Sequence, residues 1–271
     1  MAKKELAVID KFEIVSPVDG MDEELREEFM DEMEDFDDDT GIDCRKIKIP
    51  HGGIAFEVEG DDPDDAEPMK TVEGVIVFTH RMNSYWAGAF AGESEEAGNR
   101  MPDCSSYDGQ QGVHYETGEI RNCDTCPFNQ FGADGSGKAC KNMRRFYIMM
   151  SGRPMPYLLS IPPTSLKNVN FQMKRIMGST NLPYAGMVVA FKLEKAANKN
   201  GVAYSKVNVS LAGKLTPDQM KKTVAMRNEL KKKYKEVAIT ASDYNTVQER
   251  PPVVDEGAFM EVPDAADLPF N

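Results

Sequence analysis

The sequence has little that would suit a membrane-spanning or disulfide-stabilised protein. Its 271 residues include no apolar run long enough to cross a bilayer. The opening residues, 1–5, lack the apolar stretch of a signal peptide. Five cysteines are an odd number, which fits a reducing compartment better than a disulfide framework. We therefore expect a cytoplasmic protein with no membrane partner, whose cysteines are thiols or metal ligands.

Residue patterns that predict catalysis are also scarce. There are three histidines, and none falls in a recognisable Ser-His-Asp set. Residues 132–138 spell G-x-x-x-x-G-K, which resembles a phosphate-binding loop. Ala139, however, stands where the magnesium-binding Ser or Thr of such a loop would be. We predict that the protein is not an enzyme and that this stretch belongs to a cysteine-bearing loop.

The net charge of −13 conceals a strong segregation of charge. Residues 1–140 carry 12 Lys and Arg against 34 Asp and Glu, whereas residues 141–240 carry 19 against 4. Residues 241–271 carry 1 against 7. A basic block between acidic segments predicts a polyanion site whose affinity is moderated by the protein's own acidic arms.

Apolar alternation predicts a small number of strands and two helices. The expected strands occur as a pair within 45–59, a strand from 72 to about 86, and hairpins of 146–150 with 157–161 and 187–193 with 202–211. Helices are expected over 164–178, capped by Thr164 or Ser165 and closed by Gly178, and from 217 to about 237 after a capping box at Thr216. These elements predict a β-rich α+β fold containing a five-stranded barrel like that of oligonucleotide-binding (OB) proteins. The domain would occupy residues 41–240, with an insertion at about 100–142.

The two ends of the chain are expected to lie outside this domain. Residues 1–40 would be an acidic N-terminal arm, in which 21–39 hold twelve acids and one base at a helical apolar spacing. This segment is either a solvated helix with one docked stripe or an arm that competes for the basic site. Residues 241–271 are polar and contain proline, so they predict a disordered acidic tail.

Four cysteines have the spacing of a metal site. They follow C-x18-C-x2-C-x13-C, and the set is Cys104, Cys123, Cys126 and Cys140. Four thiolates complete a tetrahedral shell, so the pattern predicts one structural Zn²⁺ that replaces a missing apolar core. A redox pair at Cys123 and Cys126 is the alternative, and it fits poorly because no helix is expected to open there. His114 could replace one ligand, and Cys44 is expected to be a thiol outside the cluster.

In the basic block, cationic and aromatic residues are interleaved, as in grooves that hold single-stranded nucleic acid. Because alternate side chains of a strand point inward, roughly half of these rings are expected in the core. The candidate nucleic-acid contacts are Tyr85, Trp86, Arg144, Arg145, Tyr157, Lys174, Arg175, Tyr184, Lys192, Tyr204 and Lys206.

Residues 261–271, E-V-P-D-A-A-D-L-P-F-N, resemble the tip of bacterial single-stranded DNA-binding proteins. The resemblance implies that the tail recruits replication or recombination proteins through its acids and its aromatic residue. Asn271 departs from the pattern and would weaken docking if the partner needs the phenylalanine carboxylate. The residues that match are Asp264, Asp267, Leu268, Pro269 and Phe270.

Residues 100–170 resemble a family of bacteriophage and mobile-element proteins associated with single-stranded DNA binding. The motifs that carry this resemblance are 102–109, 123–127, 140–141 and 160–167. The family is similar in plan to phage replication proteins with a zinc subdomain inside an OB barrel. The better-known zinc site of that plan has one His among three Cys, whereas this chain offers four Cys. The resemblance implies sequence-nonspecific binding of single-stranded DNA in phage-type replication or recombination, in the bacterial host cytoplasm.

A second hypothesis is a zinc-organised adaptor or transcription regulator that binds duplex DNA through the basic helix after residue 217. Such a protein would prefer duplex over single strands. It would lose binding when the lysines of 221–235 are changed, and it would not depend on rings such as Tyr157 or Tyr204.

Overall fold

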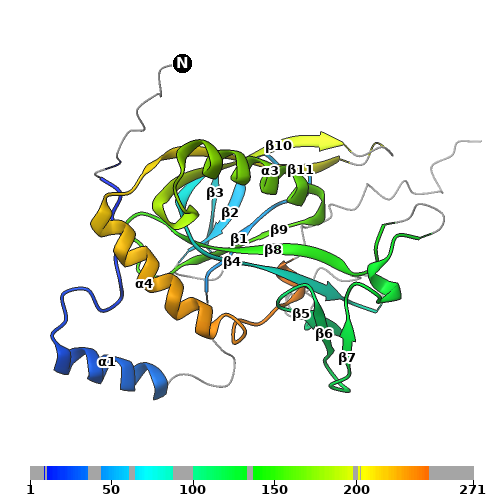
Figure 1. The fold of residues 1–271 in the computed structure, drawn as a ribbon, viewed down its shortest axis with the longest axis horizontal. Helices are drawn as coiled ribbons and strands as arrows, with labels where there is room; N and C mark the ends of the chain where they lie inside the picture. The colour runs from blue at the N-terminus through cyan, green and yellow to red at the C-terminus, as the bar shows by residue number, and fades with distance from the viewer. Residues whose placement is uncertain are drawn as a thin grey trace, which may run out of the picture.

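The computed structural model describes residues 9, 11–35, 44–60, 65–87, 100–132, 137–197, 201 and 203–243. Within these residues the chain is β-rich with three α-helices, as expected from the sequence (Figure 1). The α-helices are α1 (Glu23–Asp35), α3 (Pro163–Thr180) and α4 (Pro217–Lys233). The strands are β1 (Ile47–Lys48), β2 (Phe56–Glu59), β3 (Ala66–Met69), β4 (Thr71–Tyr85), β5 (Cys104–Ser106), β6 (Gln111–His114), β7 (Ile120–Asn122), β8 (Lys141–Met149), β9 (Tyr157–Ile161), β10 (Met187–Ala197) and β11 (Ala203–Lys214). Three short 3₁₀ helices complete the set: η1 (Pro127–Asn129), η2 (Tyr184–Gly186) and η3 (Ala241–Asp243).

The main sheet is antiparallel and open. One path runs β11-β10-β4-β5-β6-β7, and β4 also pairs through its other edge with β8, which pairs with β9. A second sheet has the order β1-β2-β3 and meets β9 through a parallel bridge between Lys46 and Leu158. No strand pairing joins β9 to β11 in the described part of the chain. The hydrogen-bonded strands therefore do not close the five-stranded barrel that the sequence predicts.

Strand β4 organises the sheet because it reaches several of the other strands. Its start, Thr71 to Gly74, pairs with β10, and its end, Asn83 to Tyr85, pairs with β5. Along its other edge it pairs with β8, with an irregularity in register between Ile76 and Phe78. Such irregularities increase local twist and bend a strand. Figure 1 shows β4 running from beside the β1–β3 sheet to the small strands β5, β6 and β7.

Gly74 is required where the start of β4 lies close beside the end of β8. A Cβ at this position would overlap the Cγ2 of Ile148 and lie 2.7 Å from the carbonyl oxygen of Met149. We expect Gly74→Ala to lower the free energy of unfolding by about 1–3 kcal/mol, as overpacked cores do. Urea denaturation of both proteins measures this difference. Gly137→Ala is the control, because a Cβ there meets nothing within 4 Å, and an equal effect of both changes would contradict the explanation.

Helix α3 covers the outer edge of β11 with a polar stripe. Ser165 accepts a hydrogen bond from the Val207 N–H at 2.9 Å, and Gln172 accepts one from the Val209 N–H at 2.7 Å. Asn168 donates to the carbonyl oxygen of Val207 at 2.7 Å. Side chains three and four residues apart share one helix face, so the helix replaces a missing strand and protects the edge.

The ends of α3 differ from the sequence prediction. The N-cap is Pro162 and makes no side-chain capping bond. Ser165, one of the two expected caps, is instead buried against β11. The helix passes Gly178 and ends at Thr180, and the C-cap residue Asn181 takes the left-handed conformation with φ 57°. For α4 the predicted capping box of Thr216 and Gln219 is confirmed, although the helix ends at Lys233 rather than near Val237.

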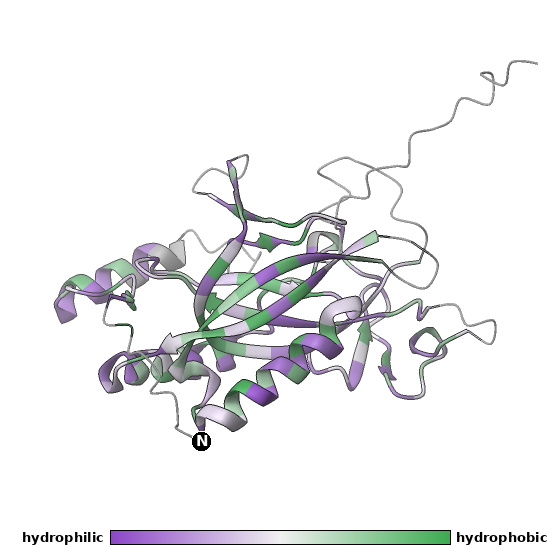
Figure 2. Cartoon of the chain, turned by 90° about the horizontal axis from the view of Figure 1, so that it is seen from above, coloured by the Kyte–Doolittle hydropathy of each residue, from purple (hydrophilic) through white to green (hydrophobic). Residues whose placement is uncertain are grey.

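Apolar side chains pack on both faces of the curved sheet. One cluster lies between the sheet, the β1–β2 pair and α3, and includes Phe56, Ile148 and Phe191. A second lies on the opposite face beneath α4 and includes Phe12 and Tyr147. Figure 2 shows the matching alternation of apolar and polar residues along strands and helices. Burial on both faces explains the continuous apolar runs in the middle of β4 and at the end of β8.

The domain extends beyond both expected boundaries. Phe12 and Ile14 are buried in the second cluster, and Ala241 is fully buried near the other end. Helix α1 forms in the acidic arm, and Leu25 on it is 53% exposed. The predicted tail residues after 243 lie outside the described residues. None of the described helices is long and apolar enough to cross a membrane.

Candidate metal centre and nucleic-acid interface

The cysteines lie in a lobe that extends from the end of β4. Cys104 begins β5, opposite Tyr85 of β4 on one side and His114 of β6 on the other. Cys123 follows β7, and Cys126 immediately precedes η1. Cys140 immediately precedes β8, so the long insertion leaves and rejoins the sheet beside the same cavity.

All four predicted ligands line one cavity of about 300 Å³. Burial raises the pKa of the Cys140 thiol to about 12, and nearby Cys123, Cys104 and Cys126 raise it further. The pKa of Cys104 is also raised, first by burial and then by Cys123 and Cys126. The four thiols are therefore electrostatic neighbours, and several thiolates would be stable here only with a cation among them.

A hydrogen-bond network around Asn129 shapes the turn that carries Cys123 and Cys126. Asn129 donates from its side chain to the carbonyl oxygen of Cys123 at 2.7 Å, and its N–H donates to that of Cys126 at 3.0 Å. Its side-chain oxygen accepts from Asn142 at 2.8 Å and from Lys138 at 3.3 Å. Lys138, the lysine of the G-x-x-x-x-G-K stretch, thus supports the cysteine loop.

The residues present suit a zinc ion. A Cβ at Gly112 would lie 2.9 Å from the sulfur of Cys104 and 3.7 Å from that of Cys123, so glycine leaves room for thiols to converge. His114 also lines the cavity, but its Nδ1 accepts a hydrogen bond from the Thr117 N–H at 3.4 Å. Among the described residues no three His, Cys, Asp or Glu side chains already stand as a metal-holding group. The thiols would therefore draw together around the ion.

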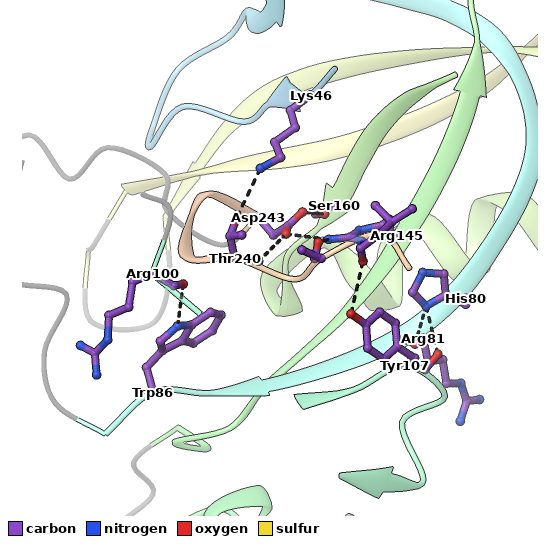
Figure 3. Close-up of polar contacts among 12 residues, drawn as sticks. Lys46, His80, Arg81, Trp86, Arg100, Tyr107, Arg145, Ser160, Thr240 and Asp243 are labelled. Atoms are coloured by element: carbon purple, nitrogen blue, oxygen red, sulfur yellow. Dashed lines mark hydrogen bonds and ion pairs between the residues drawn. The ribbon is translucent and has the colours of Figure 1, made fainter. Parts of the chain in front are cut away.

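Three of the predicted nucleic-acid contacts are buried, so these predictions are wrong. Trp86 is 6% exposed, and its ring N–H donates to the carbonyl oxygen of Arg100 at 3.4 Å (Figure 3). Tyr157 is 3% exposed and accepts a hydrogen bond from Arg45 at 3.3 Å. Arg145 is fully buried. Arg145 on β8 and Tyr157 on β9 point into the protein, and Trp86 is buried directly after the end of β4.

Arg145 is the centre of a buried polar network (Figure 3). Its guanidinium lies 2.6 Å from the carboxylate of Asp243 and donates to the carbonyl oxygens of Val237 and Ala238 at 3.2 and 3.0 Å. Asp243 also accepts from Ser160 at 2.8 Å. These contacts hold residues 237–243 against β8 and β9, so the charge has a structural role.

The remaining predicted contacts stay at least partly accessible, in separate places. Lys192, Tyr204 and Lys206 share the outward face of the β10–β11 hairpin. Lys174 and Arg175 are exposed on α3. The other three, Arg144, Tyr184 and Tyr85, are half-buried. Arg144 interacts electrostatically with Tyr184, whereas Tyr85 lines the cavity of the cysteine lobe.

Sequence reasoning missed a group of rings on the cysteine lobe. Phe128 stacks on Tyr85 with ring centroids 4.3 Å apart and planes at 20°. Phe131 is 72% exposed, and the Lys138 ammonium lies 5.3 Å from its ring centroid. Tyr115 is 67% exposed. The available signal was the presence of aromatics between cysteines, in a lobe too small to bury them.

Comparisons with protein-family models, curated proteins and solved structures found no match to this chain. Its function is therefore inferred from its own residues and their geometry.

Proposed function

We propose that this protein binds single-stranded DNA without sequence specificity, in phage-type replication or recombination. The observation that carries the proposal is the order of the main strands, β11-β10-β4-β8-β9, with α3 between β9 and β10. An OB barrel has five strands in which the first pairs with the second and the fourth, and a helix often precedes the fourth. Strands β4, β8, β9, β10 and β11 correspond to this sequence of elements.

The gap between β9 and β11 fits a partly open barrel. The hydroxyl of Ser205 on β11 donates to the carbonyl oxygens of Pro50 and, at 2.9 Å, Gly53, which connect β1 and β2. On the other side, the Leu158 N–H of β9 donates to the carbonyl oxygen of Arg45 at 2.8 Å. The β1–β2 segment thus spans the position where the third and fifth barrel strands would meet, which supports the barrel interpretation.

In this proposal the cysteine lobe is a zinc subdomain inserted between the first and second barrel strands. Four thiolates make a closed site, so one Zn²⁺ would have a structural role. Its chemistry is to hold the thiolates together, because the lobe has little apolar core. OB proteins bind oligonucleotides with this first loop and the loop between the fourth and fifth strands. The lobe would therefore present Tyr85, Phe128 and Phe131 to bases.

Cations near these two loops would neutralise phosphates. Lys138 lies in the lobe beside Phe131, and Lys192 and Lys206 lie on the hairpin that ends in the second loop. The acidic tail, through Asp264 to Phe270, would recruit replication or recombination proteins. By competing for the basic site, the tail would also weaken nonspecific binding.

The proposal predicts salt-dependent binding that prefers single strands. We expect the purified protein to bind fluorescent oligo-dT, with the logarithm of affinity falling by about 0.7 per neutralised phosphate for each tenfold rise in salt. Phe131→Leu should weaken binding about 5- to 100-fold, because one base loses its stacking partner. Fluorescence anisotropy at several salt concentrations measures both effects.

The control for the ring is Phe131→Tyr, which keeps an aromatic surface and should bind like the natural protein. Competition by duplex DNA separates the two DNA-binding hypotheses. Stronger binding to duplex, unaffected by Phe131→Leu, would favour the basic helix α4 and overturn the single-strand proposal. Absence of any salt-dependent binding would overturn both.

A further inference from the structure

A second aromatic cavity lies between β4, the turn after β5 and the end of α4. It measures about 540 Å³, within the range of small-ligand pockets. Four rings line it: Phe78, His80, Tyr107 and Tyr234. The Tyr234 ring is the common neighbour, with centroids 4.9 Å from His80, 5.2 Å from Phe78 and 6.3 Å from Tyr107. This cluster offers flat apolar surface from three separate parts of the chain.

The rim of this cavity is cationic. Its charged lining consists of Arg81, Lys231, Lys232 and Lys235 against one acid, Asp108. Asp108 is already engaged, since one of its oxygens accepts from Ser106 and from the N–H groups of Gln110 and Gln111. Lysines in a last helical turn offset the helix dipole, but here they also surround an opening lined by rings. Of these lysines, only Lys232 forms an ion pair among the described residues, with Glu229 at 2.9 Å.

His80 contributes a buried polar atom that has no partner. Its Nδ1 lies 2.9 Å from the carbonyl oxygen of Arg81 and 3.0 Å from that of Tyr107 (Figure 3). Because carbonyl oxygens only accept, Nδ1 carries the proton and Nε2 is left as an acceptor. The residue is 8% exposed, and Nε2 has no hydrogen-bond partner in the described structure. Buried acceptors without partners are uncommon, so this atom points to a missing donor.

The cavity also opens at a part of β4 that lacks a neighbouring strand. On this edge β4 pairs with β10 only through Gly74 and with β5 only from Asn83. No strand occupies the edge between these positions in the part of the chain that the structure describes. A ligand that enters here therefore displaces no sheet pairing.

We propose that this cavity holds one nucleotide of the bound single strand, with its base against Tyr107 and Tyr234, the two partly exposed rings, and its phosphates on Lys231, Lys235 and Arg81. The inference rests on the proposed single-strand binding and adds a site away from the loops. The combination of rings and cations matches a nucleotide better than it matches a wholly apolar ligand.

Substitutions at the cavity test the proposal with the full-length protein and fluorescent oligo-dT. Tyr234→Leu should weaken binding about 5- to 100-fold by removing a stacking surface, whereas Tyr234→Phe should bind normally. The double variant Lys231→Gln/Lys235→Gln should reduce the steepness of the salt dependence by about 1.4, at about 0.7 per phosphate contact. The control is Lys221→Gln/Lys233→Gln, with the same change in charge on α4 at residues that do not line the cavity. It should leave the salt slope unchanged.

The outcomes separate this inference from the function on which it rests. If the natural protein binds oligo-dT and the cavity variants behave like their controls, the cavity is not a nucleotide site, while single-strand binding stands. If the natural protein does not bind, both proposals fail. Thermal unfolding of Tyr234→Leu against Tyr234→Phe shows whether a loss of binding follows from a loss of fold. If Tyr234→Leu unfolds and Tyr234→Phe does not, the salt dependence of Lys231→Gln/Lys235→Gln decides whether the cavity binds a nucleotide.

Discussion

The Cys140→Ser variant is expected to be purified without the one zinc ion per chain that we propose for the natural protein. A serine hydroxyl is a poor zinc ligand, and structural zinc sites in small domains contribute on the order of 10 kcal/mol to folding. Because the lobe has little core of its own, strands β5, β6 and β7 should lose their protection from amide hydrogen exchange. The β4–β8 pairing near Ile76 and Ile148 should keep its protection, since it is held by the main core. Metal analysis and hydrogen exchange on the same sample measure both effects.

Cys44→Ser is the matched control for the metal. Cys44 is buried in the cluster beneath α4, away from the cavity of the other four cysteines. This variant should retain full zinc content. Stoichiometric zinc in Cys140→Ser, or a natural protein without metal, would contradict the proposed site.

Arg145→Met is expected to lower the free energy of unfolding by about 3–5 kcal/mol. The side chains of Arg145 and Asp243 are 0% and 1% exposed and lie 2.6 Å apart, so the substitution leaves a buried carboxylate without its cation. Residues 237–243 should detach from β8 and β9, because the guanidinium also donates hydrogen bonds to two carbonyl oxygens of that segment. Urea denaturation gives the free energy, and proteolysis near residue 240 reports the detachment.

Lys206→Met provides the comparison for an exposed ion pair. Lys206 lies 3.6 Å from Glu194, with both side chains partly in solvent, so its loss should change stability by less than about 1 kcal/mol. The double variant Arg145→Met/Asp243→Leu should recover part of the lost stability by removing the unpaired charge. Equal effects of Arg145→Met and Lys206→Met on the free energy of unfolding would show that the buried pair contributes no more to stability than the exposed pair.

Local patterns in the sequence were sufficient for the long strands and for α3 and α4, but not for β3 or the short strands β5, β6 and β7, which were not expected. Apolar residues located β4, the β8–β9 hairpin and the β10–β11 hairpin, because each has at least one face in a core. The Thr216 capping box located α4, since its two hydrogen bonds form within four residues. The spacing of the cysteines predicted that Cys104, Cys123, Cys126 and Cys140 belong together, and they line one cavity.

Local patterns in the sequence did not predict which individual charged or polar residues are buried. Arg145 and Lys192 are both cations on strands, yet the first pairs with Asp243 inside the protein and the second is exposed. The difference arises from residues 237–243, which cover β8 after a separation of more than ninety residues. Ser165 was expected to cap α3 but bonds to β11, because a helix that docks on a strand edge offers it a buried partner.

The sequence by itself determined the longer strands and helices, the segregation of charge and the grouping of the cysteines, since these depend on local periodicity and composition. Only the tertiary structure decided that the sheet stays open, that α3 covers the edge of β11, and that Phe78, His80, Tyr107 and Tyr234 surround a cationic cavity. These features depend on contacts between residues far apart in the chain. Their energies come from packing and from the burial of polar groups, which no local pattern encodes.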